Sequence, residues 1–185
     1  MLKWILIGLG LLIVYSLIAT AGKPTGGIAK KFTQDAWMKE NGITSMADYY
    51  FSSMHDLYMV RFVVDDEHKK VYVSQNTEAL TEIPYTDILG CETFCNDVKS
   101  GGVGRAVAGA VIAGGVGAIV GAATAKSKVD SYYIMIYTGN IASPQIKLEL
   151  ITIATKTDSQ EYKDAVDFSE KVTATIKAIL SKTEN

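Results

Sequence analysis

The sequence has very few of the residues that build disulfide scaffolds and metal sites. It contains 2 cysteines and 2 histidines among 185 residues. A small scaffold held by disulfides needs more cysteines than this, and so does a cysteine-rich zinc site, so the composition excludes both classes. Cys91 and Cys95 lie in a segment that favours a strand, where residues four apart are separated by roughly 13 Å. We therefore expect two buried free thiols, as in proteins of a reducing compartment.

A surplus of positive charge is also missing. The chain carries 18 Lys and Arg against 20 Asp and Glu, which gives a formal charge of -2. Proteins that bind nucleic acids normally present a basic surface, so we expect no nucleic-acid partner. His55 and His68 are far apart in the chain and have no further ligands at regular spacing, so we also expect no metal ion.

Recognisable catalytic motifs are absent as well. The segment Gly102–Gly109 is rich in glycine, but it lacks the Gly-Lys-Ser/Thr ending of a phosphate-binding loop. No nucleophile-elbow motif is present. The acidic triplet Asp65–Glu67 is explained by a charged hairpin turn. We therefore expect neither an enzymatic activity nor a cofactor.

What the sequence does contain is two apolar segments, of which the first is at the amino terminus. Residues 1–21 carry a single charged side chain, Lys3. The apolar run is long enough to cross a hydrocarbon core of about 30 Å as a helix that rises about 1.5 Å per residue. Lys23, Lys30 and Lys31 follow it, and positive charge tends to stay on the cytoplasmic side. We predict a single-pass transmembrane anchor that leaves the rest of the chain in the cytoplasm.

A cleaved signal peptide is the alternative for this segment. Ala19-Thr20-Ala21 has the pattern of small residues that a signal peptidase accepts, and cleavage there would release an exported protein. The apolar run is longer than the usual core of a signal peptide, which is about 7–15 residues, and this favours the anchor.

Residues 22–57 are expected to form a linker followed by short helices. One helix is predicted over Phe32–Glu40, where Gly42 ends it. A second is predicted over Ser45–Leu57, because apolar residues recur there at spacings of three and four.

From residue 58 the apolar pattern changes to the alternation of half-buried strands. One hairpin is predicted from Tyr58–Val64 and Val71–Val73, and a third strand from Ile83 through Leu89 toward Phe94. A second hairpin is predicted over residues 132–150. Together these segments indicate an antiparallel sheet with one face exposed to solvent.

The carboxyl-terminal segment is the clearest helix of the sequence. Asp158 and Glu161 have the spacing of a capping box. One apolar stripe then follows at helical spacing and consists of Tyr162, Ala165, Phe168, Val172, Ile176 and Ile179. Such a helix needs an apolar surface to cover, and the sheet supplies one. Residues 58–180 are therefore predicted to form a small domain of the α+β class.

The second apolar segment, residues 101–125, interrupts this domain, and Arg105 is its only charged residue. Small residues recur at every fourth position, which on a helix allows another backbone to approach closely. Each glycine inside a helix costs about 1 kcal/mol relative to alanine, so the segment requires packing against protein or lipid. If the strands on both sides share one sheet, both ends lie on the same side of any membrane. The segment must then turn back, and we expect a helical hairpin with its tip at Gly114-Gly115.

The small residues of this hairpin are the expected sites of oligomerisation or membrane contact. The positions with the closest expected backbone approach are Gly109, Ala113, Gly114, Gly117 and Gly121.

Three short sequences of the chain resemble a poorly characterised group of bacterial and phage proteins. They are Ile83–Ile88 (IPYTDI), Gly101–Gly109 (GGVGRAVAG) and Gly114–Gly121 (GGVGAIVG). Members of this group look like pleckstrin-homology (PH) domains with a glycine zipper inserted between two strands. The resemblance covers roughly residues 58–180. It implies a PH-like fold and a binding or membrane role, and it implies no reaction.

Three functions fit these segments. In the first, the protein is a membrane-anchored, non-enzymatic homo-oligomer whose glycine-zipper hairpins assemble a membrane scaffold or ring. In the second, it is a monomeric adaptor that binds lipid headgroups or a partner protein at the membrane surface, although the weak net charge favours the first function. In the third, it is an effector that forms a pore and disrupts the membrane. Membrane lipid is an expected partner in each case.

Overall fold

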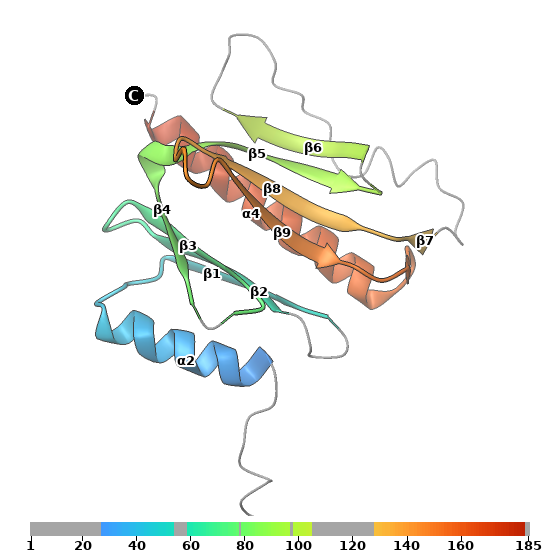
Figure 1. Cartoon of the computed structure of the whole chain (residues 1–185), viewed down its shortest axis with the longest axis horizontal. Coiled ribbons are helices and arrows are strands. Elements are labelled where there is room, and N and C mark those ends of the chain that lie inside the picture. Colours follow the sequence, from blue (N-terminus) through green and yellow to red (C-terminus); the bar gives the residue numbers. More distant parts are fainter. Residues whose placement is uncertain (1–26, 54–58, 78, 97, 105–127, 184–185) are drawn as a thin grey trace, which may run out of the picture.

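The computed structural model describes residues 27–53, 59–77, 79–96, 98–104 and 128–183. Two four-stranded antiparallel sheets and two helices make up this part of the chain (Figure 1). The α+β class, the antiparallel pairing and the carboxyl-terminal helix are confirmed. The predicted anchor at residues 1–21 lies outside the described residues. Within the described part, neither helix is both long and apolar enough to span a membrane.

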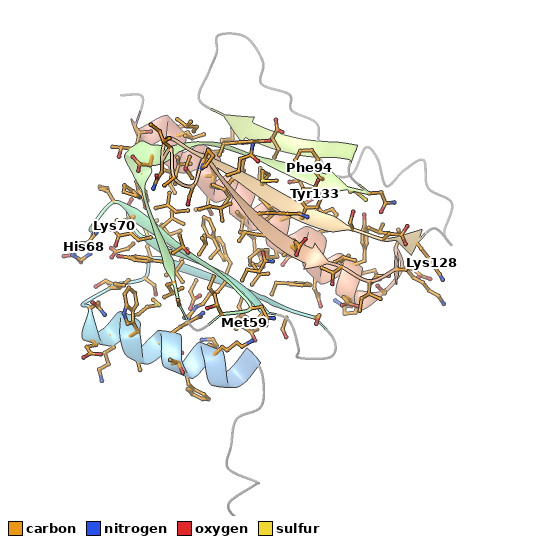
Figure 2. The ribbon with its side chains drawn as sticks, viewed as in Figure 1. Met59, His68, Lys70, Phe94, Lys128 and Tyr133 are labelled. Atoms are coloured by element: carbon orange, nitrogen blue, oxygen red, sulfur yellow. The ribbon has the colours of Figure 1, made fainter. Side chains whose placement is uncertain are left out.

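The first sheet is a meander in the order β1-β2-β3-β4. Its strands are β1 (Ala47–Ser52), β2 (Met59–Asp65), β3 (Lys70–Gln75) and β4 (Thr81–Pro84). The predicted hairpin is present, with Val64 opposite Val71 in the β2–β3 register. His68 and Lys70 mark the tip of this hairpin (Figure 2).

The second sheet has the order β6-β5-β8-β9, so its strands do not follow one another in the chain. Its strands are β5 (Ile88–Cys95), β6 (Val98–Gly104), β8 (Tyr132–Thr138) and β9 (Gln145–Ile151). A short ribbon of β7 (Lys128–Val129) and β10 (Thr155–Lys156) lies beside it. The second predicted hairpin is confirmed as β8 and β9, and alternate residues of β8 are buried as a half-buried strand requires.

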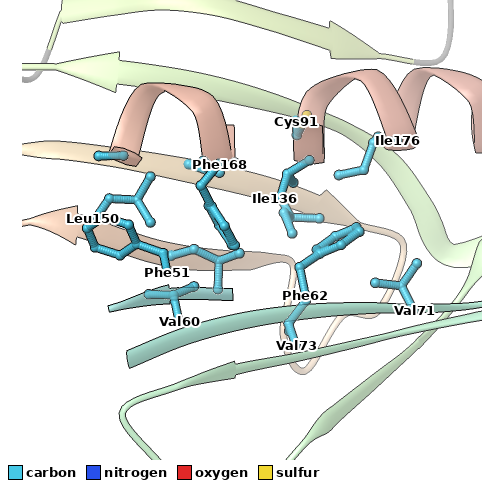
Figure 3. Packing of buried hydrophobic residues seen from close by; sticks show 14 of the residues in the cluster. Phe51, Val60, Phe62, Val71, Val73, Cys91, Ile136, Leu150, Phe168 and Ile176 are labelled. Carbon is cyan, nitrogen blue, oxygen red and sulfur yellow. The ribbon is translucent and has the colours of Figure 1, made fainter. Parts of the chain in front are cut away.

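The core fills the space between the two sheets and the helix α4 (Gln160–Thr183). Figure 3 shows Phe62 of the first sheet and Ile136 of the second sheet near Ile176 of α4. All six residues of the predicted apolar stripe of α4 are buried. Full burial of a large aliphatic or aromatic side chain stabilises a fold by about 1.5–3 kcal/mol, so this stripe is a main source of stability.

Two predictions about the strands are wrong. Residues 47–52 form β1 and not a helix, because Tyr49 and Phe51 face the core while Tyr50 between them stays exposed, and β1 pairs with β2 along its whole length. The strand predicted from Ile83 toward Phe94 is also not continuous. A turn of 3-10 helix, η1 (Tyr85–Asp87), separates β4 from β5 and carries the chain from the first sheet to the second.

Two further boundaries differ from the prediction. Residues 101–104, predicted as the start of the insert, belong to β6 and pair with β5. The cap of α4 is Ser159 in place of Asp158, because the Ser159 Oγ accepts a hydrogen bond of 3.2 Å from the Tyr162 backbone N–H. Glu161 remains in the first turn of the helix, where a negative charge is favourable.

The helix α2 (Gly27–Glu40) lies on the face of the first sheet that points away from α4 (Figure 1). It includes the helix predicted over residues 32–40 and begins five residues earlier. Gly42 follows it with a φ of +67°, a conformation that glycine adopts without strain. The chain can therefore reverse there and enter β1.

A buried arginine attaches α2 to the sheet. Arg61 is 1% exposed, and its guanidinium donates hydrogen bonds to Asp48 on β1 and to Gln34 and Asp35 on α2. Because an unpaired buried charge is very unfavourable, Arg61 requires these partners, and therefore requires α2 in place. The sequence analysis missed this network. The sequence feature that could have indicated this network is Arg61 itself, a charged residue inside the apolar run of β2.

Lowering the pH should loosen the attachment of α2. Burial alone would raise the pKa of Asp35, but the hydrogen bond and charge of Arg61 outweigh it and hold that pKa below its usual value. A carboxylate with a lowered pKa stabilises the fold above its unfolded-state pKa of about 4, and this stabilisation is lost as the pH falls through the folded-state value. The difference in free energy of unfolding between the wild type and Asp35→Asn should be largest near neutral pH and should close in acid.

Urea unfolding followed by tryptophan fluorescence measures this difference. Trp37 on α2 lies edge-on to Tyr72 of the sheet, with 6.0 Å between ring centroids, and therefore reports on the attachment. The chain has two tryptophans, so Trp4→Phe leaves Trp37 as the only one. A stability difference that does not change with pH would contradict the role assigned to Asp35.

Candidate functional site

The five residues predicted to mediate oligomerisation or membrane contact lie outside the described part of the chain. These are Gly109, Ala113, Gly114, Gly117 and Gly121. The structure does describe the two points where the chain leaves and re-enters the fold, Gly104 at the end of β6 and Lys128 at the start of β7. These two points define the base of the candidate site, and residues 105–127 connect them.

The register shows that the two points are at opposite ends of the second sheet. Gly104 is opposite Gly90 of β5, whereas Tyr132, just after the re-entry point, is opposite Cys95. Five residues of β5 separate these levels, which is roughly 17 Å at about 3.3 Å per residue. β6 and β8 are also two strand spacings apart, or roughly 10 Å. Gly104 and Tyr132 are therefore roughly 20 Å apart, and Lys128 precedes Tyr132 by four residues.

The asparagine at the end of β5 fixes the re-entry point. The Asn96 Oδ1 accepts hydrogen bonds from the backbone N–H groups of Asp130 and Ser131, at 2.8 and 3.3 Å. The Asn96 N–H in turn donates to the Ser131 carbonyl at 2.9 Å. Asn96 has a φ of 48°, a left-handed conformation that asparagine tolerates better than most residues. One residue therefore turns the chain after β5 and also holds the segment that leads into β8.

The outer face of β5 and β8 carries an aromatic cluster between the two points. Phe94 and Tyr133 are stacked with 5.0 Å between ring centroids, and the Lys147 Nζ lies 4.3 Å from the centroid of the Tyr133 ring (Figure 2). The Tyr137 hydroxyl donates a hydrogen bond of 2.9 Å to Glu92. Burial, with the hydrogen bond and charge of Glu92, raises the pKa of Tyr137 to about 12, so this hydroxyl stays protonated. These half-buried side chains give the outer face a mixed apolar and polar character.

Both cysteines are free and belong to β5, as the sequence analysis predicted. Cys91 is fully buried, whereas Cys95 is only half-buried. Burial raises the pKa of the Cys95 thiol, which disfavours the reactive thiolate. In the part of the chain that the structure describes, no three His, Cys, Asp or Glu residues come together in a way that could hold a metal ion.

The acidic triplet of the β2–β3 turn has a structural role. Asp65 is buried and accepts hydrogen bonds from the backbone N–H and the ring of His68, at 3.1 and 2.7 Å. Asp66 accepts hydrogen bonds of 3.2 Å from Lys182 on α4 and from the Tyr85 hydroxyl of η1. The hydrogen bond from Lys182 holds the pKa of Asp66 below its usual value. The turn thus joins the first sheet to the end of α4. The other histidine, His55, lies outside the described residues.

Two substitutions of Asn96 should separate the contribution of its side-chain hydrogen bonds from that of its backbone conformation. Asn96→Gly keeps the left-handed conformation and loses the two side-chain hydrogen bonds, which should lower the free energy of unfolding by about 1 kcal/mol. Asn96→Ala loses the same bonds and also strains the backbone, so it should cost about 2 kcal/mol. Urea unfolding of both variants measures the difference, and equal values would show that the conformation of Asn96 contributes nothing.

A family model described as "Glycine zipper containing PH domain" matches residues 48–152. The match begins in β1 and ends just after β9, and it includes both points that define the base of the candidate site. The search of curated proteins and the search of solved structures each found no match.

Proposed function

Because the chain belongs to the family of glycine-zipper-containing PH domains, we propose that it is a non-enzymatic, membrane-attached protein that forms homo-oligomers through residues 105–127. In this proposal the apolar residues 1–21 provide the attachment to the membrane and leave the β domain on the cytoplasmic side. The assembled protein acts as a scaffold or ring at the membrane.

The main support is that, among the described residues, the two sheets and α4 already share one continuous apolar core. The stripe of α4 fills the space between the two sheets, where buried residues from both sheets contact it. Rows of glycine and alanine at every fourth position suit contact with another helix at close range.

The spacing of the two base points favours contacts between subunits. Packed helices lie about 8–10 Å apart, whereas Gly104 lies roughly 20 Å from Tyr132, the start of the strand that follows the re-entry point. Two helical arms that rose directly from Gly104 and Lys128 would be too far apart to pack against each other near the sheet. The hairpin predicted from the sequence therefore needs connecting residues at its base, and rows of small residues from a second subunit are the natural partners for its arms.

A substitution of one small residue tests this proposal. Gly117→Leu places a large side chain in the row of small residues and should break the oligomer into smaller species, while the β domain stays folded. Val116→Leu is the control, because it adds bulk at the neighbouring position, outside the row of small residues Gly109, Ala113, Gly117 and Gly121. The mass of the detergent-extracted protein measures assembly, and circular dichroism checks the fold. An oligomer of unchanged mass in Gly117→Leu would refute the proposal.

Replacement of the whole segment gives a second, stronger test. A Gly/Ser linker should replace residues 105–124 and leave β6 intact, since Gly104 pairs with Gly90. This variant should be monomeric in detergent. A monomer both before and after replacement would exclude assembly through the segment.

One observation favours the adaptor function as a second candidate. Lys128 and Lys156 are directly opposite each other in the β7–β10 ribbon, and both are exposed. Two lysines at the point where the segment re-enters the fold suit contact with anionic lipid headgroups, at roughly 1 kcal/mol each near the surface. Under this function, binding to phosphatidylserine vesicles would persist without residues 2–21 and would fall as salt is added.

A further inference from the structure

The outer edge of β1 and one face of α4 form a groove with a volume of about 410 Å³. On the strand side it is lined by five consecutive residues, 48–52. Successive side chains of a strand point to opposite faces, so a wall made of consecutive residues is the edge of the strand. The helix side consists of residues spaced as one helical face, namely Asp164, Asp167, Phe168 and Lys171.

The groove has an apolar floor that holds the strand and helix at a fixed distance. Phe51 and Phe168 pack against each other with 6.1 Å between ring centroids. The Tyr49 hydroxyl forms a hydrogen bond of 3.0 Å with the Thr175 hydroxyl of α4. The groove is therefore built by the core of the domain, and its volume is in the range of ligand sites.

The edge of β1 lacks three of the features that commonly protect an exposed strand, namely a lysine, a proline and a bulge. Proteins block such edges with lysine, proline or bulges. The other three outer strands of the two sheets each have one of these, because β4 contains Pro84, β6 contains Lys99 and β9 contains Lys147. β1 contains neither lysine nor proline, and its register with β2 has no bulge. In the described part of the chain only β2 pairs with β1, so the outward N–H and C=O groups of residues 47–51 have no second strand beside them there.

Charge indicates which strand would fit. Three of the four charged side chains that line the groove are acidic. Asp48 pairs with Arg61 and Asp167 with Lys171, whereas no ion pair involves Asp164 among the described residues. A second copy of this groove would bring another Asp164 carboxylate and, among the described residues that line it, no free cation to pair with the first, which argues against pairing with a second copy of the chain.

We propose that this groove binds an extended, basic peptide segment of a partner protein, which adds to β1 as an outer strand. Backbone hydrogen bonds to the β1 edge provide the affinity, and alternate side chains of the peptide face either the phenylalanine floor or the acidic face of α4. A lysine or arginine of the peptide pairs with Asp164. This site is separate from the segment proposed to mediate assembly, so either proposal can fail without the other.

Binding of a defined peptide to the detergent-solubilised chain of residues 1–185 tests the proposal. The probe is a fluorescent acetyl-Lys-Val-Lys-Val-Lys-Val-Lys-amide, with one control in which Glu replaces Lys and a second in which the valines are N-methylated. Fluorescence polarisation measures affinity, and hydrogen exchange by mass spectrometry measures protection of residues 47–52. The basic peptide should bind and slow exchange in β1, and N-methylation should weaken binding by at least roughly tenfold, because it removes backbone donors.

Two variants of α4 locate the site. Asp164→Asn should weaken binding by roughly threefold, as expected for a single exposed ion pair. Glu170→Gln removes an exposed charge of the same helix away from the groove and should leave binding unchanged. Equal loss in both variants, equal binding of the N-methylated peptide, or no change in exchange at β1 would overturn the proposal. Protection of β1 that rises with protein concentration without peptide would also overturn it, because a second copy would then occupy the edge.

Discussion

The burial of the α4 stripe between the two sheets is the interaction on which the rest of the structure depends. α4 packs against the apolar inner faces of both sheets, with Phe168 against Phe51 of the first sheet and Ser169 bonded to the Tyr132 hydroxyl of the second. This helix thus joins the two sheets into one core. The same packing also sets the distance between α4 and the edge of β1 and so creates the groove.

The network of Arg61 extends this domain beyond the region that defines its family. α2 precedes residues 48–152 in the chain, yet Gln34 and Asp35 of this helix supply hydrogen bonds that the buried guanidinium requires. The first sheet is therefore covered on both faces, by α4 on one side and α2 on the other (Figure 1).

The sequence predicted those elements whose side chains show a clear period. The stripe of α4 and the alternation of β8 are examples, and both are present. β1 was mistaken for a helix because its aromatic residues also match helical spacing, and pairing with β2 decides between the two. Residues 101–104 of β6 could not be recognised, since three of the four are glycines and glycine has no side chain to alternate. The candidate assembly residues lie outside the described part, so their role still rests on their spacing.

The separation of Gly104 and Lys128 has a mechanical consequence. A rigid body that is held at one point can swivel about it, whereas a body held at two well-separated points can rotate only about the line that joins them. In an assembly held together by residues 105–127, each β domain would lose most of its rotational freedom relative to its own tether. Neighbouring domains would then present the same face in the same direction, and the sheet would define the repeat of the assembly.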